Sequence, residues 1–371
     1  MNLGFFTMPM HPRGKDWQQS LAEDRAAFIL ADKLGFTEGY CGEHATDPEE
    51  NITSSAMFIA TLVDATRTIR LGTGTVNMPN HHPAATAGTL AMLDHLLGGR
   101  FIFGISPGAL PSDAEIFGSL DKDRAAMFLE AINQVLAIWT GEAPYRLEGK
   151  FWSISTERTY IAETGMGVVP KPLQRPHPPI VVTAVAPHSK GVAEAAARGW
   201  DPISANFLMP VWVKTHWAKY VEGCAKGNRS ADAANWRIAK TLCLAADDAT
   251  ARRYATDPNG PYYHYYRSLM GKLKRRGAPL TLFKNDPNTP DSEVTVESVL
   301  ENLVIHGSPA KVADQLLAFR EQVGDFGTLL YAGMDWQDRE LGRNSMVLMA
   351  EQVMPRINAA IGTGSRAALA P

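Results

Sequence analysis

Short apolar segments alternate with amphipathic segments along most of this chain. The apolar segments predict eight strands, at residues 2–6, 35–41, 68–78, 100–105, 178–185, 201–204, 237–246 and 326–333. Helical spacing of apolar residues predicts helices at residues 17–34, 84–97, 124–139, 189–198 and 309–322. Because a helix or a long loop separates every pair of successive strands, the strands are expected to be parallel. Eight such repeats favour an α/β fold that closes as a (β/α)8 TIM barrel, and an open doubly wound sheet is the alternative.

The 371 residues fit one barrel domain with insertions, predicted over residues 1–360. Two excursions leave the alternating pattern, at residues 141–178 and 256–296. The second holds an aromatic and basic helix followed by a polar, proline-rich loop, which is typical of a lid or a disordered connection. Its basic run at residues 272–276 is interpreted as a solvated helix face. The tail at residues 361–371 is expected to be disordered.

Charge and cysteine content exclude several classes of function. A formal net charge of −3 gives no electrostatic basis for binding nucleic acid or an anionic membrane. No apolar run approaches 18 residues, and the N-terminus resembles a strand more than a signal peptide. Cys41, Cys224 and Cys243 have no paired spacing, so neither a disulfide framework nor a zinc site is indicated. These features predict a cytoplasmic enzyme.

The segment GTGTVN, residues 72–77, looks like part of a dinucleotide fingerprint but lacks its third glycine. MPNHHP follows where that fingerprint requires a helix, and no GxxxxGK[ST] phosphate loop occurs in the chain. We therefore expect no nicotinamide or ATP site. Gly72 and Gly74 weaken a strand here and leave room for a flat ligand to approach the backbone.

Two positions carry candidate chemistry. His44 follows the second predicted strand, where a barrel places groups for proton transfer or substrate binding, although a satisfied buried histidine is the alternative. His81 and His82 are adjacent and no HxH or HExxH pattern occurs, so a metal site is not expected. The segment from His188 to Gly191 begins a predicted helix and suits an anion site, unless Ser189 merely caps that helix.

The loop after the fourth strand, within GRFIFGISPGALPSDAEIFG at residues 99–118, is constrained by glycine and proline. Pro107 and Pro111 supply no N–H to a strand ladder, and Gly108 permits a positive φ. Loops of this kind after a buried strand are often functional.

Four segments resemble one family over nearly the whole chain: ADKLGF…EH at 31–44, IRLGTGTVNMPNHHPAATAGTLAMLDHLLGGRFIFGISPG at 69–108, VTAVAPHSKGVAEAAARG at 182–199 and HGSPAKVADQL at 306–316. The chain resembles the bacterial luciferase-like flavin monooxygenases, and among them the limonene- and ketocamphane-type enzymes. The resemblance implies an eight-stranded barrel with a non-proline cis peptide at Gly74-Thr75, beneath the flavin.

The resemblance also implies roles for particular residues. His44 matches the active-site histidine, and Ser106 stands where luciferase has a reactive cysteine beside the flavin. The residues that it assigns to the flavin and its phosphate are Gly74, Thr75, Ser106, Arg124, Thr183, His188, Ser189, Lys190 and Gly191. Two departures stand out: Pro107 replaces a flavin-contacting arginine, and Ala45 replaces a second histidine, which argues against light emission from an aldehyde. The 99–118 loop is then expected to form a wall of the flavin pocket.

The function implied is a two-component monooxygenase. FMNH2 from a separate reductase and O2 would form a C4a-hydroperoxyflavin in a dry pocket and oxygenate a small hydrophobic substrate. The predicted apolar pocket entrance consists of Phe6, Met8, Phe207, Met209 and Trp212, which could equally be core. A homodimer is expected, as is usual in this family.

The alternatives are an F420-dependent hydride-transfer enzyme of the same fold, a metal-dependent hydrolase that lacks visible ligands, and a non-catalytic flavin-binding protein, which would not need His44. The sequence indicates neither the substrate nor the choice between hydroxylation, epoxidation and Baeyer–Villiger insertion.

Overall fold

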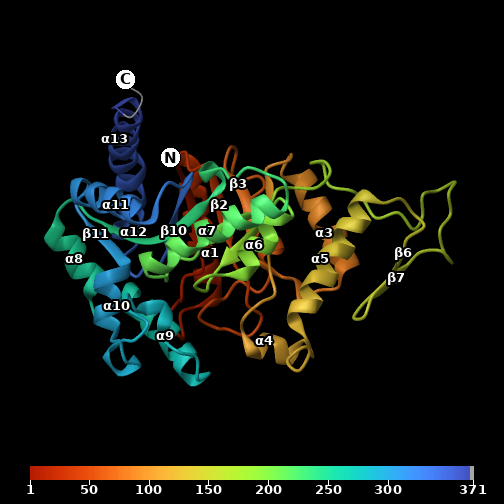
Figure 1. The fold of residues 1–371 in the computed structure, drawn as a ribbon, viewed down its shortest axis with the longest axis horizontal. Helices are drawn as coiled ribbons and strands as arrows, with labels where there is room; N and C mark the ends of the chain where they lie inside the picture. The colour runs from red at the N-terminus through yellow and green to blue at the C-terminus, as the bar shows by residue number, and fades with distance from the viewer. Residues whose placement is uncertain (368–371) are drawn as a thin grey trace. The chain divides into compact units, whose positions relative to one another are not determined.

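A computed structural model describes residues 1–367 and shows a closed parallel barrel with surrounding helices (Figure 1). The barrel strands are β1 (Asn2–Thr7), β2 (Glu38–Cys41), β3 (Arg70–Thr73), β5 (Phe101–Ser106), β8 (Ile180–Ala184), β9 (Asp201–Ser204), β10 (Arg237–Leu244) and β12 (Thr328–Gly333). Because β10 pairs with both β9 and β12, the ring of eight strands closes. The predicted (β/α)8 TIM barrel is confirmed, and the open-sheet alternative is wrong.

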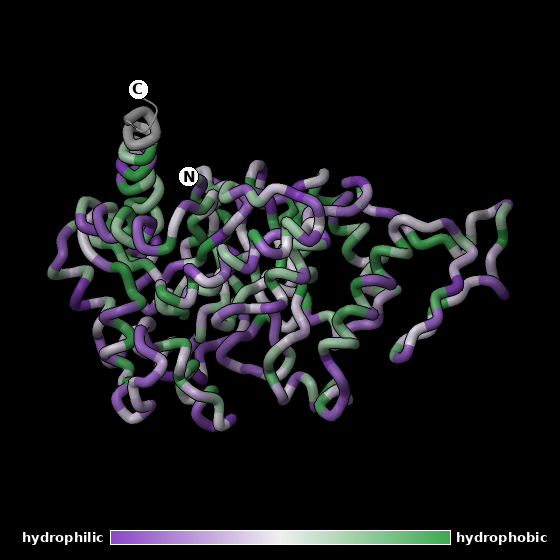
Figure 2. The backbone as a smooth tube through the Cα atoms, viewed as in Figure 1, coloured by the Kyte–Doolittle hydropathy of each residue, from purple (hydrophilic) through white to green (hydrophobic). Residues whose placement is uncertain are grey.

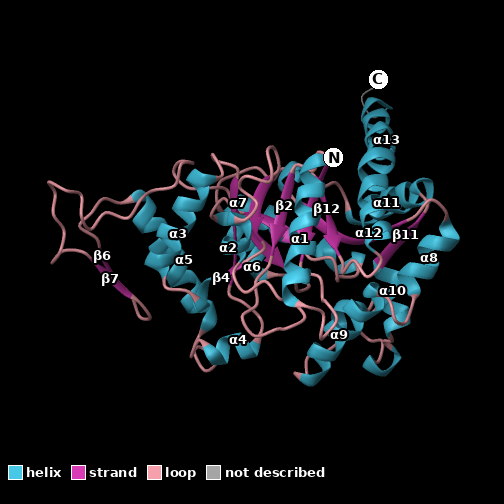
Figure 3. Ribbon diagram, turned by 180° about the vertical axis from the view of Figure 1, so that it is seen from behind, coloured by secondary structure: helices cyan, strands magenta, loops and turns pink. Residues whose placement is uncertain are grey.

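The chain divides into two compact units. The first comprises residues 1–39, 48–50 and the described residues from 182 onward, and the second comprises residues 40–47 and 51–181. In the first unit, β1 pairs in parallel with β12, from Asn2 opposite Thr328 to Thr7 opposite Gly333. Helix α1 (Trp17–Lys33) begins at Asp16, whose side chain accepts a hydrogen bond from the Gln19 N–H, and packs against β1 (Figure 3).

The other helices and the extra strand of the first unit follow β8 in the sequence. They are α6 (Lys190–Ala197), α7 (Pro210–Lys226), α8 (Asp248–Thr256), α9 (Pro261–Arg275), α10 (Val296–Leu303), β11 (Val304–Gly307), α11 (Pro309–Val323), α12 (Arg339–Leu348) and α13 (Met354–Ala367). Helix α13 enters the segment 361–371, for which a disordered tail is expected from the sequence; residues 368–371 lie outside the described residues. Among residues 1–367, no helix is both long and apolar enough to cross a membrane.

Helix α9 is the aromatic helix expected within residues 256–296, and its tyrosines at positions 262, 265 and 266 are buried. Tyr262 donates a hydrogen bond to the Leu242 carbonyl at 2.8 Å, and the Tyr266 hydroxyl lies 2.8 Å from Thr241 Oγ1. Both partners belong to β10, so α9 packs on a barrel strand, and these two buried tyrosine hydroxyls have hydrogen-bond partners. This helix is therefore part of the folded core of the first unit.

The second unit contains β3, β5, β4 (Val76–Asn77), α2 (Ser55–Ala60), α3 (Pro83–Leu96), α4 (Pro111–Ile116), α5 (Arg124–Thr140), β6 (Arg146–Glu148) and β7 (Ser153–Ser155). Hydrophobic and hydrophilic residues alternate along α5 (Figure 2), and Met127, Ala131, Val135 and Ile138 form its buried face at helical spacing. The excursion 141–178 contains the β6–β7 hairpin, whose turn is fixed to α5 because Glu130 accepts hydrogen bonds from the backbone N–H groups of residues 150–152.

The single strand predicted at residues 68–78 is two short strands in the structure. Leu71 of β3 pairs with Phe101, and Val76 of β4 pairs with Ile105, so both segments run beside β5. Between them, Gly74 and Thr75 are joined by a cis peptide bond, as the family resemblance implies.

Lys240 interrupts the apolar pattern of β10, and burial of this side chain leads to a stability prediction. Its ammonium lies 4.8 Å from the centroid of the Phe319 ring, and no carboxylate of the described residues pairs with it. Burial lowers the pKa of Lys240 to about 8, whereas an unfolded lysine titrates near 10.4. Between these values the unfolded state binds more protons, so stability rises with pH across this window.

We expect Lys240→Met to raise the free energy of unfolding at pH 7 by about 1–3 kcal/mol, because the folded protein no longer has to bury the charged ammonium. The gain should shrink as the pH approaches 10, where the lysine of the folded protein is neutral. Urea unfolding at pH 7 and pH 10 measures both values. A gain of equal size at the two pH values would show that the charge of Lys240 is not the cause.

Candidate active site

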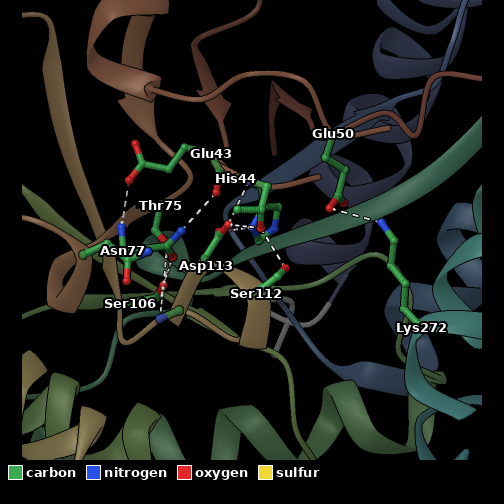
Figure 4. A network of polar contacts seen from close by, with 12 residues as sticks. Glu43, His44, Glu50, Thr75, Asn77, Ser106, Ser112, Asp113 and Lys272 are labelled. Carbon is green, nitrogen blue, oxygen red and sulfur yellow. Dashed lines mark hydrogen bonds and ion pairs between the residues drawn. The ribbon is translucent and has the colours of Figure 1, made fainter. Parts of the chain in front are cut away.

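Glu43, two residues beyond β2, organises the polar side of the second unit (Figure 4). Its buried carboxylate accepts hydrogen bonds from the Ser55 N–H at 3.0 Å, the Ser55 hydroxyl at 2.7 Å and the Asn77 N–H at 3.0 Å, and lies 2.8 Å from His81 Nε2. Burial alone raises the pKa of Glu43, but the hydrogen bonds and charge of His81 and the bonds from Ser55 outweigh it and hold that pKa below its usual value. Glu43 therefore joins α2, β4 and the loop after β2 as an ionised carboxylate.

His44 forms a histidine–carboxylate pair with Asp113 of α4. His44 Nδ1 lies 3.0 Å from Asp113 Oδ2, and Thr46 donates to Asp113 Oδ1 from its N–H at 2.9 Å and its hydroxyl at 2.6 Å. Burial raises the pKa of Asp113, but the hydrogen bonds from His44 and Thr46 outweigh it and lower that pKa. An ionised Asp113 accepts a proton donor at Nδ1, which orients the imidazole and leaves Nε2 as its basic nitrogen. The His44 side chain is 15% exposed.

Ser106, at the end of β5, lies in a chain of hydroxyl hydrogen bonds (Figure 4). Thr75 donates to Ser106 Oγ at 2.6 Å, Ser106 donates to Asn77 Oδ1 at 3.0 Å, and the Gly108 N–H donates to Ser106 Oγ at 3.1 Å. Asn77 also donates from Nδ2 to the Glu43 carbonyl at 3.0 Å. The loop after β5 is thereby tied to the same carboxylate residue that holds β4.

Gly72 does not leave room for a ligand, contrary to the expectation from the sequence. A Cβ on Gly72 would lie 2.5 Å from the Tyr40 ring, so the aromatic side chain of the neighbouring strand fills this space. Glycine is needed here for packing between β2 and β3.

Arg124, the first residue of α5, uses its guanidinium within the second unit. It donates to the Pro107 carbonyl at 2.6 Å, to Asn80 Oδ1 at 3.3 Å and to Ser119 Oγ. These bonds fix the loop that carries Ser106 to the start of α5. A role for Arg124 in binding phosphate stays a prediction.

The predicted anion-binding residues lie in the first unit, around the start of α6. Ser189 is the N-cap residue of this helix, but its side chain makes no capping hydrogen bond. His188 adopts a left-handed conformation with φ of 51°, and its N–H donates to Thr215 Oγ1 at 2.9 Å. The hydrogen bond that Ser189 would make as a simple helix cap is therefore absent. Lys190 and Gly191 are exposed beside it.

The structure brings only some of the predicted flavin-binding residues into contact with one another. Thr75 and Ser106 are hydrogen-bonded to each other, and Arg124 binds the carbonyl of the residue after Ser106. These three residues belong to the second unit, as His44 does, whereas Thr183 and residues 188–191 belong to the first unit. Of the predicted pocket entrance, Met209 and Trp212 are buried core residues. The Trp212 indole N–H donates to the carbonyls of Thr281 and Lys284, both at 2.9 Å, and so holds residues 281–284 of the 256–296 excursion. Phe6, Met8 and Phe207 are half-buried, and their role stays a prediction.

Asp113, Glu43 and Asn77 are site residues that the sequence patterns did not identify. Asp113 lies 69 positions from its partner His44, and no periodicity or spacing links them. The one available signal was the constrained loop at residues 99–118, which contains Asp113.

Within the described part of the chain, one group of side chains has the spacing of a metal site. Ligand atoms of His11, Glu23 and Asp335 lie within 4.8 Å of one another. Lys15 donates to Glu23 at 2.7 Å and to Asp335 at 2.5 Å. Burial lowers the pKa of His11, but the hydrogen bonds and charges of Asp24 and Asp335 outweigh it and raise that pKa to about 9. The carboxylates are thus paired with two protein cations, which favours a buried ion-pair network over a metal site.

Known proteins show what this fold and site resemble. The family model for luciferase-like monooxygenases matches residues 1–325. The chain is 29% identical to 4-hydroxyprotoasukamycin monooxygenase of Streptomyces nodosus subsp. asukaensis, covering 97% of this chain and 93% of that protein. It is 34% identical to the oxygenase component of the flavin-dependent trigonelline monooxygenase of Acinetobacter baylyi, over 88% and 87% of the two chains.

A solved structure extends the comparison to three dimensions. The oxygenating constituent of 3,6-diketocamphane monooxygenase from Pseudomonas putida, a type II Baeyer–Villiger monooxygenase solved in complex with FMN, matches with a TM-score of 0.86. It is 26% identical, and the match covers 96% of this chain and 99% of that one. The protein therefore belongs to the family of luciferase-like monooxygenases and is an enzyme of the oxidoreductase class.

Proposed function

We propose that the protein is the oxygenase of a two-component system, which takes FMNH2 from a separate reductase and uses O2 to oxygenate a small hydrophobic substrate. The observation that carries the proposal is the His44–Asp113 pair beyond β2, in the same unit as the hydroxyl chain from Thr75 through Ser106 to Asn77. Relatives support it, because one is named an oxygenase component and another an oxygenating constituent that holds FMN. The homodimer stays a prediction, which the mass of the purified protein in solution would test.

The residues present suit a bound flavin. Reduced FMN, when bound, supplies the electrons that activate O2. His44, oriented by Asp113, can donate or accept a proton at Nε2 toward a substrate oxygen. The Thr75 and Ser106 hydroxyls are held at fixed positions by their mutual hydrogen bond and by Asn77, so they can contact a flat ring without rearranging. The Ser189 hydroxyl and the amides at the start of α6 are suited to a phosphate.

The reductase requirement tests the proposal directly. Purified protein with NADH, FMN and O2 should consume almost no substrate, and an added flavin reductase should restore turnover. Anaerobic titration with FMNH2 and with reduced F420 should show tight binding of the flavin only. Efficient NADH oxidation by the chain alone, or hydride transfer from reduced F420, would contradict the two-component assignment.

Ser189→Ala should weaken FMNH2 binding by about 1–2 kcal/mol, because it removes a hydroxyl donor to a charged phosphate. Riboflavin, which has no phosphate, should bind the variant and the wild type alike. Equilibrium titrations under anaerobic conditions measure both affinities. Ser308→Ala is a matched control, since Ser308 is the N-cap residue of α11 and also makes no side-chain capping bond. Equal losses for FMNH2 and riboflavin would instead indicate distortion of α6.

A further inference from the structure

A second site candidate lies in the first unit, on helix α9. A pocket of about 690 Å³ is lined by residues of α9, by residues 12 and 13 after β1 and by Glu49. Its volume falls in the range of small-molecule sites, about 300–1,000 Å³. We call it the α9 pocket, and its charged and titratable lining residues are Arg13, Glu49, His264, Arg267, Lys274 and Arg275.

The lining carries an excess of positive charge. Four cationic side chains face one carboxylate, although the whole chain has a formal net charge of −3. Glu49 is paired with Arg13, at 3.3 Å from Nε, and with the neighbouring Lys272, at 3.9 Å. Lys272 also contacts Glu50 at 3.5 Å (Figure 4). Lys274 and Arg275 form no ion pair within residues 1–367, although the charge of Lys274 helps to lower the pKa of Asp291. The lining of the α9 pocket therefore keeps more cationic than anionic side chains.

His264 provides an independent sign of a missing ligand. Its Nε2 atom is buried and makes no hydrogen bond, and Glu49 Oε1 lies 3.8 Å from it, beyond hydrogen-bond distance. Its other ring nitrogen, Nδ1, lies 3.5 Å from Arg267 Nη2, an atom that can only donate. If Nδ1 accepts from Arg267, Nε2 carries a proton and is a donor without an acceptor. Buried polar atoms of this kind are rare and call for an explanation.

We propose that the α9 pocket binds a small organic anion, with a carboxylate or phosphate held by Arg267, Arg275 and the His264 Nε2–H. Guanidinium groups bind such oxyanions in bidentate geometry, and the carbon stems of the arginine and lysine side chains can cover an apolar body. The basic run at residues 272–276 is then more than a solvated helix face, because two of its members line the pocket. This inference does not depend on the proposed reaction, since it uses residues of the first unit, whereas His44 belongs to the second.

Calorimetric titration with three probes tests the proposal: phenyl phosphate, benzoate and the uncharged benzyl alcohol. We expect saturable binding of at least one anion, weakened by added salt, and none of the alcohol. The double variant Arg267→Gln/Arg275→Gln should lose about tenfold or more in affinity, the loss expected for charge-assisted hydrogen bonds. Whichever anion binds more tightly identifies the headgroup as phosphate or carboxylate.

Arg276→Gln is the matched control, because Arg276 is an exposed cation next to Arg275 that does not line the pocket. It should bind the anions within about twofold of the wild type, as expected for a change outside the contacts. Circular dichroism and urea midpoints confirm that each variant folds. An equal loss in Arg276→Gln, equally tight binding of benzyl alcohol, or no saturable anion binding would overturn the proposal. A double variant that weakens only reductase-coupled turnover would also overturn it, in favour of a protein-docking surface.

Discussion

His44→Ala should lower product formation by about 10²- to 10⁴-fold, the range that a positioned acid–base group contributes. The imidazole is oriented at Nδ1 by Asp113, so its loss removes the group that can act on a substrate oxygen. The fold should persist, because the His44 side chain is partly exposed and the other described bonds to Glu43 and Asp113 do not involve it. Product formed per FMNH2 oxidised, with hydrogen peroxide assayed in parallel, should show oxygen reduction diverted to peroxide.

Two companion variants separate a catalytic from a structural role for His44. Asp113→Asn keeps the shape of the side chain but removes the charge. It should reduce the rate of product formation less than His44→Ala does, and it should shift the pH profile of turnover. His95→Ala, which removes an exposed histidine of the same unit, should change neither quantity. Normal rate and normal coupling in His44→Ala would mean that His44 is a structural residue.

Glu43→Leu should lower the free energy of unfolding by about 3–5 kcal/mol, the cost of removing one partner from a buried charged network. The substitution leaves the Ser55 and Asn77 N–H groups and the His81 ring without their acceptor. Urea unfolding at neutral pH measures the loss. Glu115→Leu, at an exposed position of α4, is the control and should change stability by no more than about 0.5 kcal/mol.

The same variant has a predicted pH dependence. The pKa of Glu43 is lower in the folded protein than the value near 4.3 of an unfolded glutamate, so its ionisation stabilises the fold above that unfolded value. This contribution is lost as the pH falls through the lower, folded pKa. The difference in free energy of unfolding between wild type and Glu43→Leu should therefore become smaller at acid pH. A constant difference between pH 7 and pH 3 would contradict the role given to the carboxylate.

The barrel was predictable because its strands are buried on both faces and so form continuous apolar runs. Residues 101–105, for example, are all buried, as the sequence FIFGI suggests. The break at Gly74-Thr75 was not visible in the apolar pattern, and only the family resemblance indicated it. Lys240 lies within such a run, where the surrounding residues determine the strand and the lysine is buried with it.

The site was predictable where one residue carries the signal and not where two distant residues combine. His44 stands out by its place after a strand, but its partner Asp113 is recognisable only once α4 is folded against the loop after β2. The basic run of α9 is a second case in which residues distant in the sequence combine only in the folded chain. Its charges suggest solvent exposure, and nothing in the local sequence reveals that Lys274 and Arg275 share a pocket with Arg13.

Transfer of one atom of O2 to an organic product is the central claim, and isotope labelling tests it most directly. The protein is loaded with FMNH2 under anaerobic conditions, without NADH, and mixed with ¹⁸O2 and a panel of small hydrophobic ketones and alkenes. Mass spectrometry should find a product that carries one ¹⁸O atom, and His44→Ala should form far less of it. Unlabelled substrate with only hydrogen peroxide and oxidised FMN, together with anaerobic oxidation of reduced F420 by the same panel, would contradict the account.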